Sequence, residues 1–167
     1  MKKFGLLVAS ALVASSLMAA APVSSPSANK FGLTMGSNVG GGIVYDTPKY
    51  QYTLTTGVWS TNVSSSVDTY DIRASASMKT PMTSSIDQLW TVQGYAQTST
   101  NYKRAFGATG SMPYNVSLQY GFQQAISKKL SSYIRLPIIG YNGNSNRSDT
   151  ITLLDENATV IGISMYR

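Results

Sequence analysis

Three charged residues with side chains suited to ion-pair chemistry stand on faces that carry mainly uncharged polar residues: Asp71, Arg73 and Arg135. Asp71 and Arg73 are two positions apart, so in an extended chain their side chains point to the same side. Such a set could gate a narrow channel, or it could belong to a polar core in which every charge has a partner. We favour the polar core, because an unpaired buried charge costs several kcal/mol. Gln119 would join this polar network.

Composition limits the other reactive chemistry. The sequence contains no cysteine and no histidine, which excludes disulfides, thiolate or imidazole metal sites, cysteine nucleophiles and a Ser-His-Asp triad. The glycines at 40–42 lack the lysine of a phosphate-binding loop. Several carboxylates stand beside turns, where Asp is common, so we expect no enzyme, no cofactor and no metal site. The carboxylates left to form a catalytic pair are Asp46, Asp68, Asp71, Asp87, Asp149, Asp155 and Glu156.

The segments that would position these residues alternate with period two, which is typical of β-strands. The clearest run is 115–123, where one face is apolar and the other is polar and uncharged. No helix is predicted after residue 29, and glycines on the polar face of 31–46 are expected to relieve crowding around a narrow lumen. The predicted strands are 31–46, 49–60, 67–79, 88–98, 104–112, 115–126, 130–141, 149–154 and 158–166.

Breaks between the strands are predicted from turn signals. A break at Ser37 and Asn38 would raise the number of strands from nine to ten. Short turns are expected at 46–49, 112–115 and 127–129, and a longer loop is expected at 142–148.

The N-terminus is typical of a secretory signal peptide. Lys2 and Lys3 precede the uncharged run 4–18, and alanines follow at 19–21, as cleavage requires. The alternative, a single membrane anchor, needs a longer apolar span. We predict a signal peptide over 1–21, a flexible leader over 22–29 and one β-domain over 30–167.

The basic residues give no sign of a nucleic-acid surface. Signal cleavage lowers the formal net charge from +6 to +4, and the remaining basic residues are scattered along the chain, which argues against nucleic acid as a partner. Some attraction to anionic lipid headgroups is expected instead.

The character of the two strand faces distinguishes a membrane barrel from a soluble sheet. Only 12% of the residues are charged, against about 25% in a typical soluble domain. The polar faces carry Gly, Ser, Thr, Asn and Gln, which suit the interior of a small barrel. Tyrosines near strand ends suit an interfacial girdle: Tyr45, Tyr50, Tyr52 and Tyr70. The residues expected to face lipid are Leu54, Ile72, Val116, Leu118, Tyr120 and Phe122.

The signal peptide, the amphipathic strands of about ten residues and the terminal strand together resemble the small outer-membrane β-barrels of Gram-negative bacteria. The resemblance covers the chain from residue 30 onward as a pattern. It implies an all-β fold, an antiparallel up-and-down transmembrane β-barrel of 8–10 strands. It also implies location in the outer membrane, with the lipid bilayer and the outer-membrane assembly machinery as partners.

A barrel of this size has an interior filled by side chains, so the expected role is structural or surface-interacting. The loops at 98–104 and 142–148 could contact lipopolysaccharide, another polysaccharide or a surface ligand. Two alternatives stay open. One is a secreted, soluble β-sandwich or adhesin-like binding domain, and the other is a narrow gated channel for small solutes.

Overall fold

The computed structural model describes residues 28–37, 39–61, 67–99, 113–144, 147–154 and 159–167, and every regular element in these ranges is a β-strand. The strands form one antiparallel sheet. They are β1 (Lys30–Gly36), β2 (Gly40–Asp46), β3 (Tyr50–Thr61), β4 (Val67–Pro81), β5 (Ile86–Ser99), β6 (Pro113–Ser127), β7 (Leu130–Asn144), β8 (Arg147–Leu153) and β9 (Val160–Tyr166).

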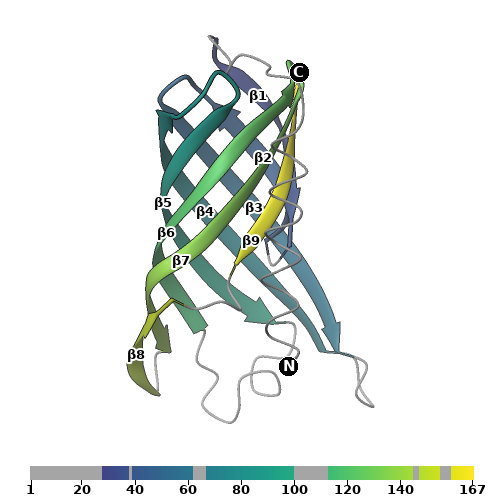
Figure 1. The fold of residues 1–167 in the computed structure, drawn as a ribbon. Helices are drawn as coiled ribbons and strands as arrows, with labels where there is room; N and C mark the ends of the chain where they lie inside the picture. The colour runs from purple at the N-terminus through teal and green to yellow at the C-terminus, as the bar shows by residue number, and fades with distance from the viewer. Residues whose placement is uncertain (1–27, 38, 62–66, 100–112, 145–146, 155–158) are drawn as a thin grey trace, which may run out of the picture.

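The sheet closes on itself into a barrel (Figure 1). Strands β1 to β7 pair in chain order, and β9 closes the ring between β7 and β1. β9 pairs with the first half of β7, and β8 pairs with the second half. β8 therefore lies beside the same edge of β7 as β9, but farther along it. The expected antiparallel all-β barrel is therefore confirmed, closed by eight strands, and the two-sheet sandwich is not the architecture.

Several strand boundaries differ from those expected. The first predicted segment is divided into β1 and β2, and Gly40 begins β2 with a φ of 66°, in the region that favours glycine. Pro113 begins β6 instead of lying in a turn. The loop predicted at 142–148 is mostly strand, because β7 continues to Asn144 and β8 begins at Arg147. The predicted strand 104–112 lies outside the described residues.

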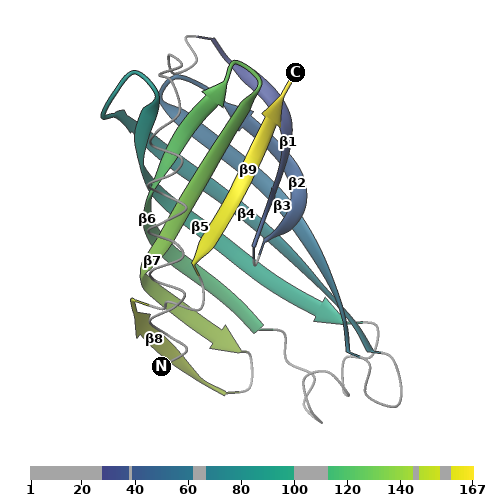
Figure 2. The same cartoon turned by 45° about the vertical axis from the view of Figure 1, so that its right-hand side comes forward.

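The wall of the barrel is uneven in height. β1, β2 and β9 each contain 7 residues, whereas β3 to β7 contain 12 to 15. We call the end where β1 begins and β9 ends the terminal end, and the opposite one the far end. Figure 2 shows the longer strands and β8 continuing past the short ones toward the far end. The barrel is thus closed at its terminal end and continues from there as an open sheet.

The connections also differ between the two ends. Residues 47–49, 82–85 and 128–129 make the turns of the terminal end. The turn after β2 is fixed by Thr47, whose backbone N–H and side-chain hydroxyl both donate to the Tyr50 carbonyl. β5 ends and β6 begins at the far end, and 13 residues of sequence separate these two strands.

Side chains alternate between a polar interior and an apolar outer surface. Most of the large apolar side chains on the strands are exposed, and the buried side chains are mainly Ser, Thr, Gln and charged residues. Glycines let neighbouring strands coil closely around the narrow interior: a Cβ on Gly42 or Gly121 would lie 2.0 or 1.9 Å from a backbone oxygen of the adjacent strand. The expectation that glycines relieve crowding is confirmed at these close approaches.

Candidate functional site: the polar interior of the barrel

Lys79 is the centre of a buried ionic group near the terminal end. Its Nζ is 2.9 Å from Asp46 Oδ1 and 3.5 Å from Asp87 Oδ2, and it also donates to the Thr47 carbonyl oxygen at 3.1 Å. The Lys79 side chain is 1% exposed. The two carboxylates therefore share one desolvated ammonium group, which is the arrangement in which buried charges are tolerated.

Neutral polar side chains extend this ionic group across the lumen. Asp46 Oδ2 accepts from Tyr166 Oη at 2.9 Å and from Gln123 Nε2 at 3.2 Å. Gln123 also donates to Ser131 Oγ at 3.2 Å and accepts from Gln51 Nε2 at 2.9 Å. One residue comes from every closing strand except β1, so the network links seven of the eight strands that close the barrel. This Lys79 cluster consists of Asp46, Gln51, Lys79, Asp87, Gln123, Ser131 and Tyr166.

Arg135 belongs to a second layer of interior side chains, which lies farther from the terminal end than the Lys79 cluster. Its Nη1 donates to Ser75 Oγ at 3.0 Å, and Ser75 is in turn 2.6 Å from Thr53 Oγ1. The guanidinium lies 4.5 Å from the centre of the Tyr133 ring, close enough for a cation–π interaction. Within the described residues no carboxylate oxygen lies within 4 Å of Arg135. Among these described residues, its charge is therefore held by neutral dipoles and a ring face.

Tyr133 fits into this layer because two neighbouring positions are glycines. A Cβ on Gly162 would lie 2.4 Å from the Tyr133 ring, and one on Gly36 would lie 3.1 Å from its hydroxyl. Val39 and Val160 pack in the same buried apolar group as Tyr133. The alternation places Val39 on the outer apolar face, but it is 4% exposed, because it lies in the turn between β1 and β2 where the parity of a strand no longer applies.

Asp71 and Arg73 form an ion pair farther from the terminal end. Arg73 Nη2 is 3.0 Å from Asp71 Oδ2, and the Arg73 guanidinium lies 4.5 Å from the centre of the Tyr95 ring. Asp71 Oδ1 also accepts from the backbone N–H of Gly57 at 2.7 Å. Gly57 is the first residue of β3 beyond its register with β2, which ends at Thr56. Asp71 thus accepts a hydrogen bond from a backbone N–H of β3 that has no partner in β2, because the pairing of these two strands stops at Thr56.

The four residues predicted for the interior all point inward, but they do not form one group. Asp71, Arg135 and Gln119 are buried, and Arg73 is partly buried. Asp71 and Arg73 contact each other, whereas Arg135 binds Ser75 and Gln119 donates to Ser117 at 3.1 Å.

The six residues predicted for the outer surface all lie on the outward face of their strands. Leu54, Ile72, Val116 and Leu118 are exposed, and Tyr120 and Phe122 are half-buried. The two aromatic rings lie 5.3 Å apart in an edge-to-face contact, and Tyr120 also packs against Trp90 at 4.9 Å. Their partial burial comes from this aromatic packing on the outside of the wall.

The sequence reasoning missed the Lys79 cluster. Asp46 is predicted in the turn 46–49, and Asp87 is named only among the carboxylates, because both stand at a strand end. The alternation of the strands could have identified these residues. Asp46 lies an even number of positions from the buried Thr34, and Lys79 lies an even number from the buried Asp71, so both side chains should point inward. Tyr166, a second missed member, likewise alternates with the outward Met165.

The interior resembles a packed polar core more than a reactive centre. The carboxylates of Asp46 and Asp87 share Lys79, and the described residues contain no group of three His, Cys, Asp or Glu side chains that could hold a metal ion. In the part of the chain that the structure describes, no helix has the length and apolarity to cross a membrane.

Fold and interior together define a small closed antiparallel β-barrel with a polar, side-chain-filled lumen and an apolar outer surface. Comparison of the chain with known protein families, with curated proteins and with solved structures finds no match in any of the three.

Proposed function

We propose that this chain is an outer-membrane β-barrel whose role is structural or surface-interacting. The observation that carries the proposal is the distribution of side chains between the two faces of the wall. Ile72 and Val92 are 55% and 54% exposed on the outside, while Asp46 and Lys79 are almost fully buried inside. A protein surrounded by water hides apolar side chains and exposes charges. The reverse arrangement suits a barrel whose outer surface contacts hydrocarbon.

The connections support an orientation for this barrel. Bacterial barrels of this type have short periplasmic turns and longer extracellular loops. The turns at 47–49, 82–85 and 128–129 share the terminal end, and the 100–112 connection is at the far end. We therefore place the terminal end in the periplasm and the far end outside the cell, where a polysaccharide or surface ligand would bind.

Cell fractionation tests the membrane location. The full chain, expressed with its N-terminal segment in a Gram-negative host, should remain in the outer-membrane fraction after extraction with alkaline carbonate. On an SDS gel the unboiled sample should migrate differently from the boiled one, since a closed barrel resists detergent until heated. A carbonate-soluble protein with no shift would contradict the proposal and favour a secreted binding domain.

The narrow-channel alternative needs a continuous aqueous path. The Lys79 cluster crosses the lumen at the terminal end, and Arg135 lies buried below it, so we favour a barrel that does not conduct. Planar-bilayer recordings of the purified barrel should show no discrete current steps. Current steps that change in Arg73→Ala or Arg135→Ala would favour the channel instead.

A further inference from the structure

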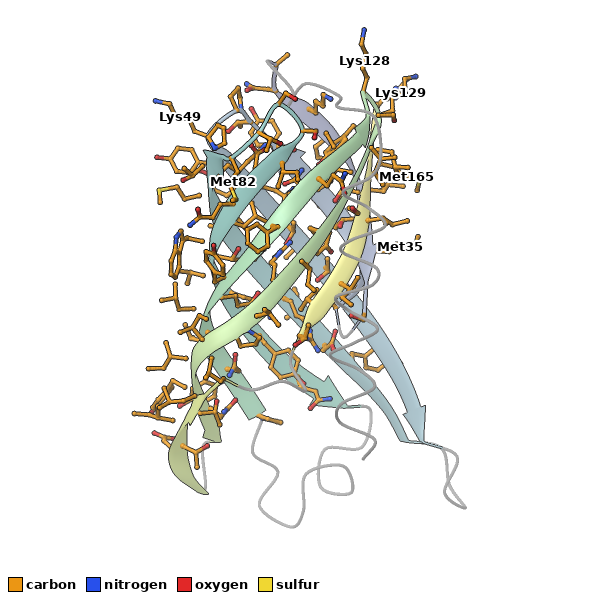
Figure 3. All side chains as sticks on the ribbon, in the orientation of Figure 1. Met35, Lys49, Met82, Lys128, Lys129 and Met165 are labelled. Atoms are coloured by element: carbon orange, nitrogen blue, oxygen red, sulfur yellow. The ribbon has the colours of Figure 1, made fainter. Side chains whose placement is uncertain are left out.

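Among the residues that the structure describes, the exposed charged side chains of the terminal end are all basic. Lys49, Lys128, Lys129 and Arg167 are exposed there, and Lys30 is partly exposed. Figure 3 shows Lys49, Lys128 and Lys129 projecting away from the barrel at this end. We call these five residues the basic rim. Lys30 donates to the carbonyl of Lys128 and lies 5.3 Å from the centre of the Tyr166 ring, so the rim is also anchored to the wall.

The carboxylates of the same end do not neutralise this rim on the surface. Asp46 and Asp87 are 0% and 4% exposed, and both are within ion-pair distance of Lys79 inside the lumen. Asp149, the exposed carboxylate among the side chains that the structure describes, lies in β8 toward the far end. The fold has therefore separated the charges: Asp46 and Asp87 turn inward to Lys79 at the terminal end, and the five bases of the rim remain outside.

The basic rim lies next to the exposed apolar side chains of the outer surface, where lipid headgroups are expected. Lys49 stands in the turn between β2 and β3, directly beside three exposed tyrosines of the outer surface. The Tyr45 and Tyr52 rings are 6.4 Å apart, and those of Tyr50 and Tyr52 are 6.3 Å apart. Such aromatic groups mark the boundary between hydrocarbon and headgroups, so the adjacent ammonium groups reach the phosphate layer.

We propose that the basic rim binds the headgroups of anionic phospholipids in the leaflet that surrounds the terminal end. The inference rests on the proposed membrane location and adds to it a preferred lipid class. A lysine near an anionic surface contributes about fivefold in affinity. Removing three lysines should therefore weaken the preference for anionic lipid strongly, on the order of a hundredfold if their contributions add.

Fluorescence quenching by brominated lipids measures this preference directly. The full barrel is placed in vesicles of phosphatidylcholine that contain increasing fractions of brominated phosphatidylglycerol or brominated phosphatidylcholine. Trp90, which is 38% exposed on the outer surface, should be quenched at lower fractions of brominated phosphatidylglycerol. The K49Q/K128Q/K129Q variant should lose this difference, and the K49R/K128R/K129R variant should keep it because its charge is unchanged. Salt should weaken the preference of the original protein.

The outcomes separate this inference from the proposed membrane location. Equal quenching by the two brominated lipids would overturn the lipid preference while leaving the barrel in the bilayer. No quenching by either lipid would place the protein outside the bilayer and overturn both. A preference that survives in K49Q/K128Q/K129Q would show that other groups recognise the anionic lipid, and the basic rim would not be its site.

Discussion

Replacement of Lys79 by methionine tests whether the interior network stabilises the barrel. Lys79 Nζ is within 4 Å of carboxylate oxygens of both Asp46 and Asp87, and its side chain is 1% exposed. Removing one partner of a buried ion pair costs about 3–5 kcal/mol, because the charge left behind stays desolvated. Two carboxylates lose their cation here, so we expect K79M to lower the free energy of unfolding by at least about 3 kcal/mol.

Urea unfolding of the barrel in lipid vesicles, followed by tryptophan fluorescence, measures this loss. The midpoint should fall while the dependence on urea stays the same, as expected when stability changes without a change in compactness. The triple variant D46N/K79M/D87N is the matched control. It has no uncompensated charge and should recover most of the lost stability. An unchanged midpoint in K79M, or a triple variant no more stable than K79M, would refute the reasoning.

Three further substitutions and one control probe other parts of the wall, all measured by the same urea midpoint. Leu118→Arg on the outer face should cost about 2–4 kcal/mol in a bilayer near its midplane, and an unchanged midpoint would remove Leu118 from the lipid-facing surface. Gly121→Ala should unfold at much lower urea, since its Cβ would lie 1.9 Å from a carbonyl oxygen. Gly94→Ala is its control and should unfold at the same urea concentration as the original protein, because an added Cβ there meets no atom within 4 Å. Arg135→Met should leave the urea midpoint unchanged or raise it, because it removes a buried charge that no described carboxylate pairs with. A loss as large as that of the lysine variant would show that the guanidinium is needed.

Alternation in the sequence predicted the faces of the strands better than their ends. A one-residue shift exchanges the two faces of a strand, so a strand with one apolar face and one polar face leaves little doubt about its orientation. The ends depend on pairing with other strands. The composition of 142–148 is typical of a loop, yet Asn142 lies opposite Asn115, whose Nδ2 donates to it at 2.6 Å. This tertiary pairing extends β7 where local preferences would end it.

The interior residues were predictable individually, but their partners were not. Parity assigns Asp71, Arg73 and Arg135 to the polar face, yet which of them meet depends on the stagger of strands around the barrel. That stagger is a property of the closed sheet. Asp71 and Arg73 share β4, so their contact follows from spacing alone. Arg135 reaches Ser75 from β7 across the lumen, and no feature of either segment indicates that pairing.

The position of the Lys79 cluster relates the chemistry of the interior to the shape of the barrel. The wall is closed by eight strands only over the height that β1, β2 and β9 cover. The Lys79 cluster lies within that height and takes a residue from both short strands that end beside it, Asp46 of β2 and Tyr166 of β9. Short strands contribute few ladder hydrogen bonds, so side-chain bonds across the lumen add to the stability of the closed part. At the opposite limit of the closed part, where β2 begins, Asp71 accepts the N–H of Gly57, the first β3 residue that has no partner in β2. Apart from Arg135, the buried charges therefore form ion pairs near the two limits of β2, where contacts beyond the backbone ladder support the closed ring.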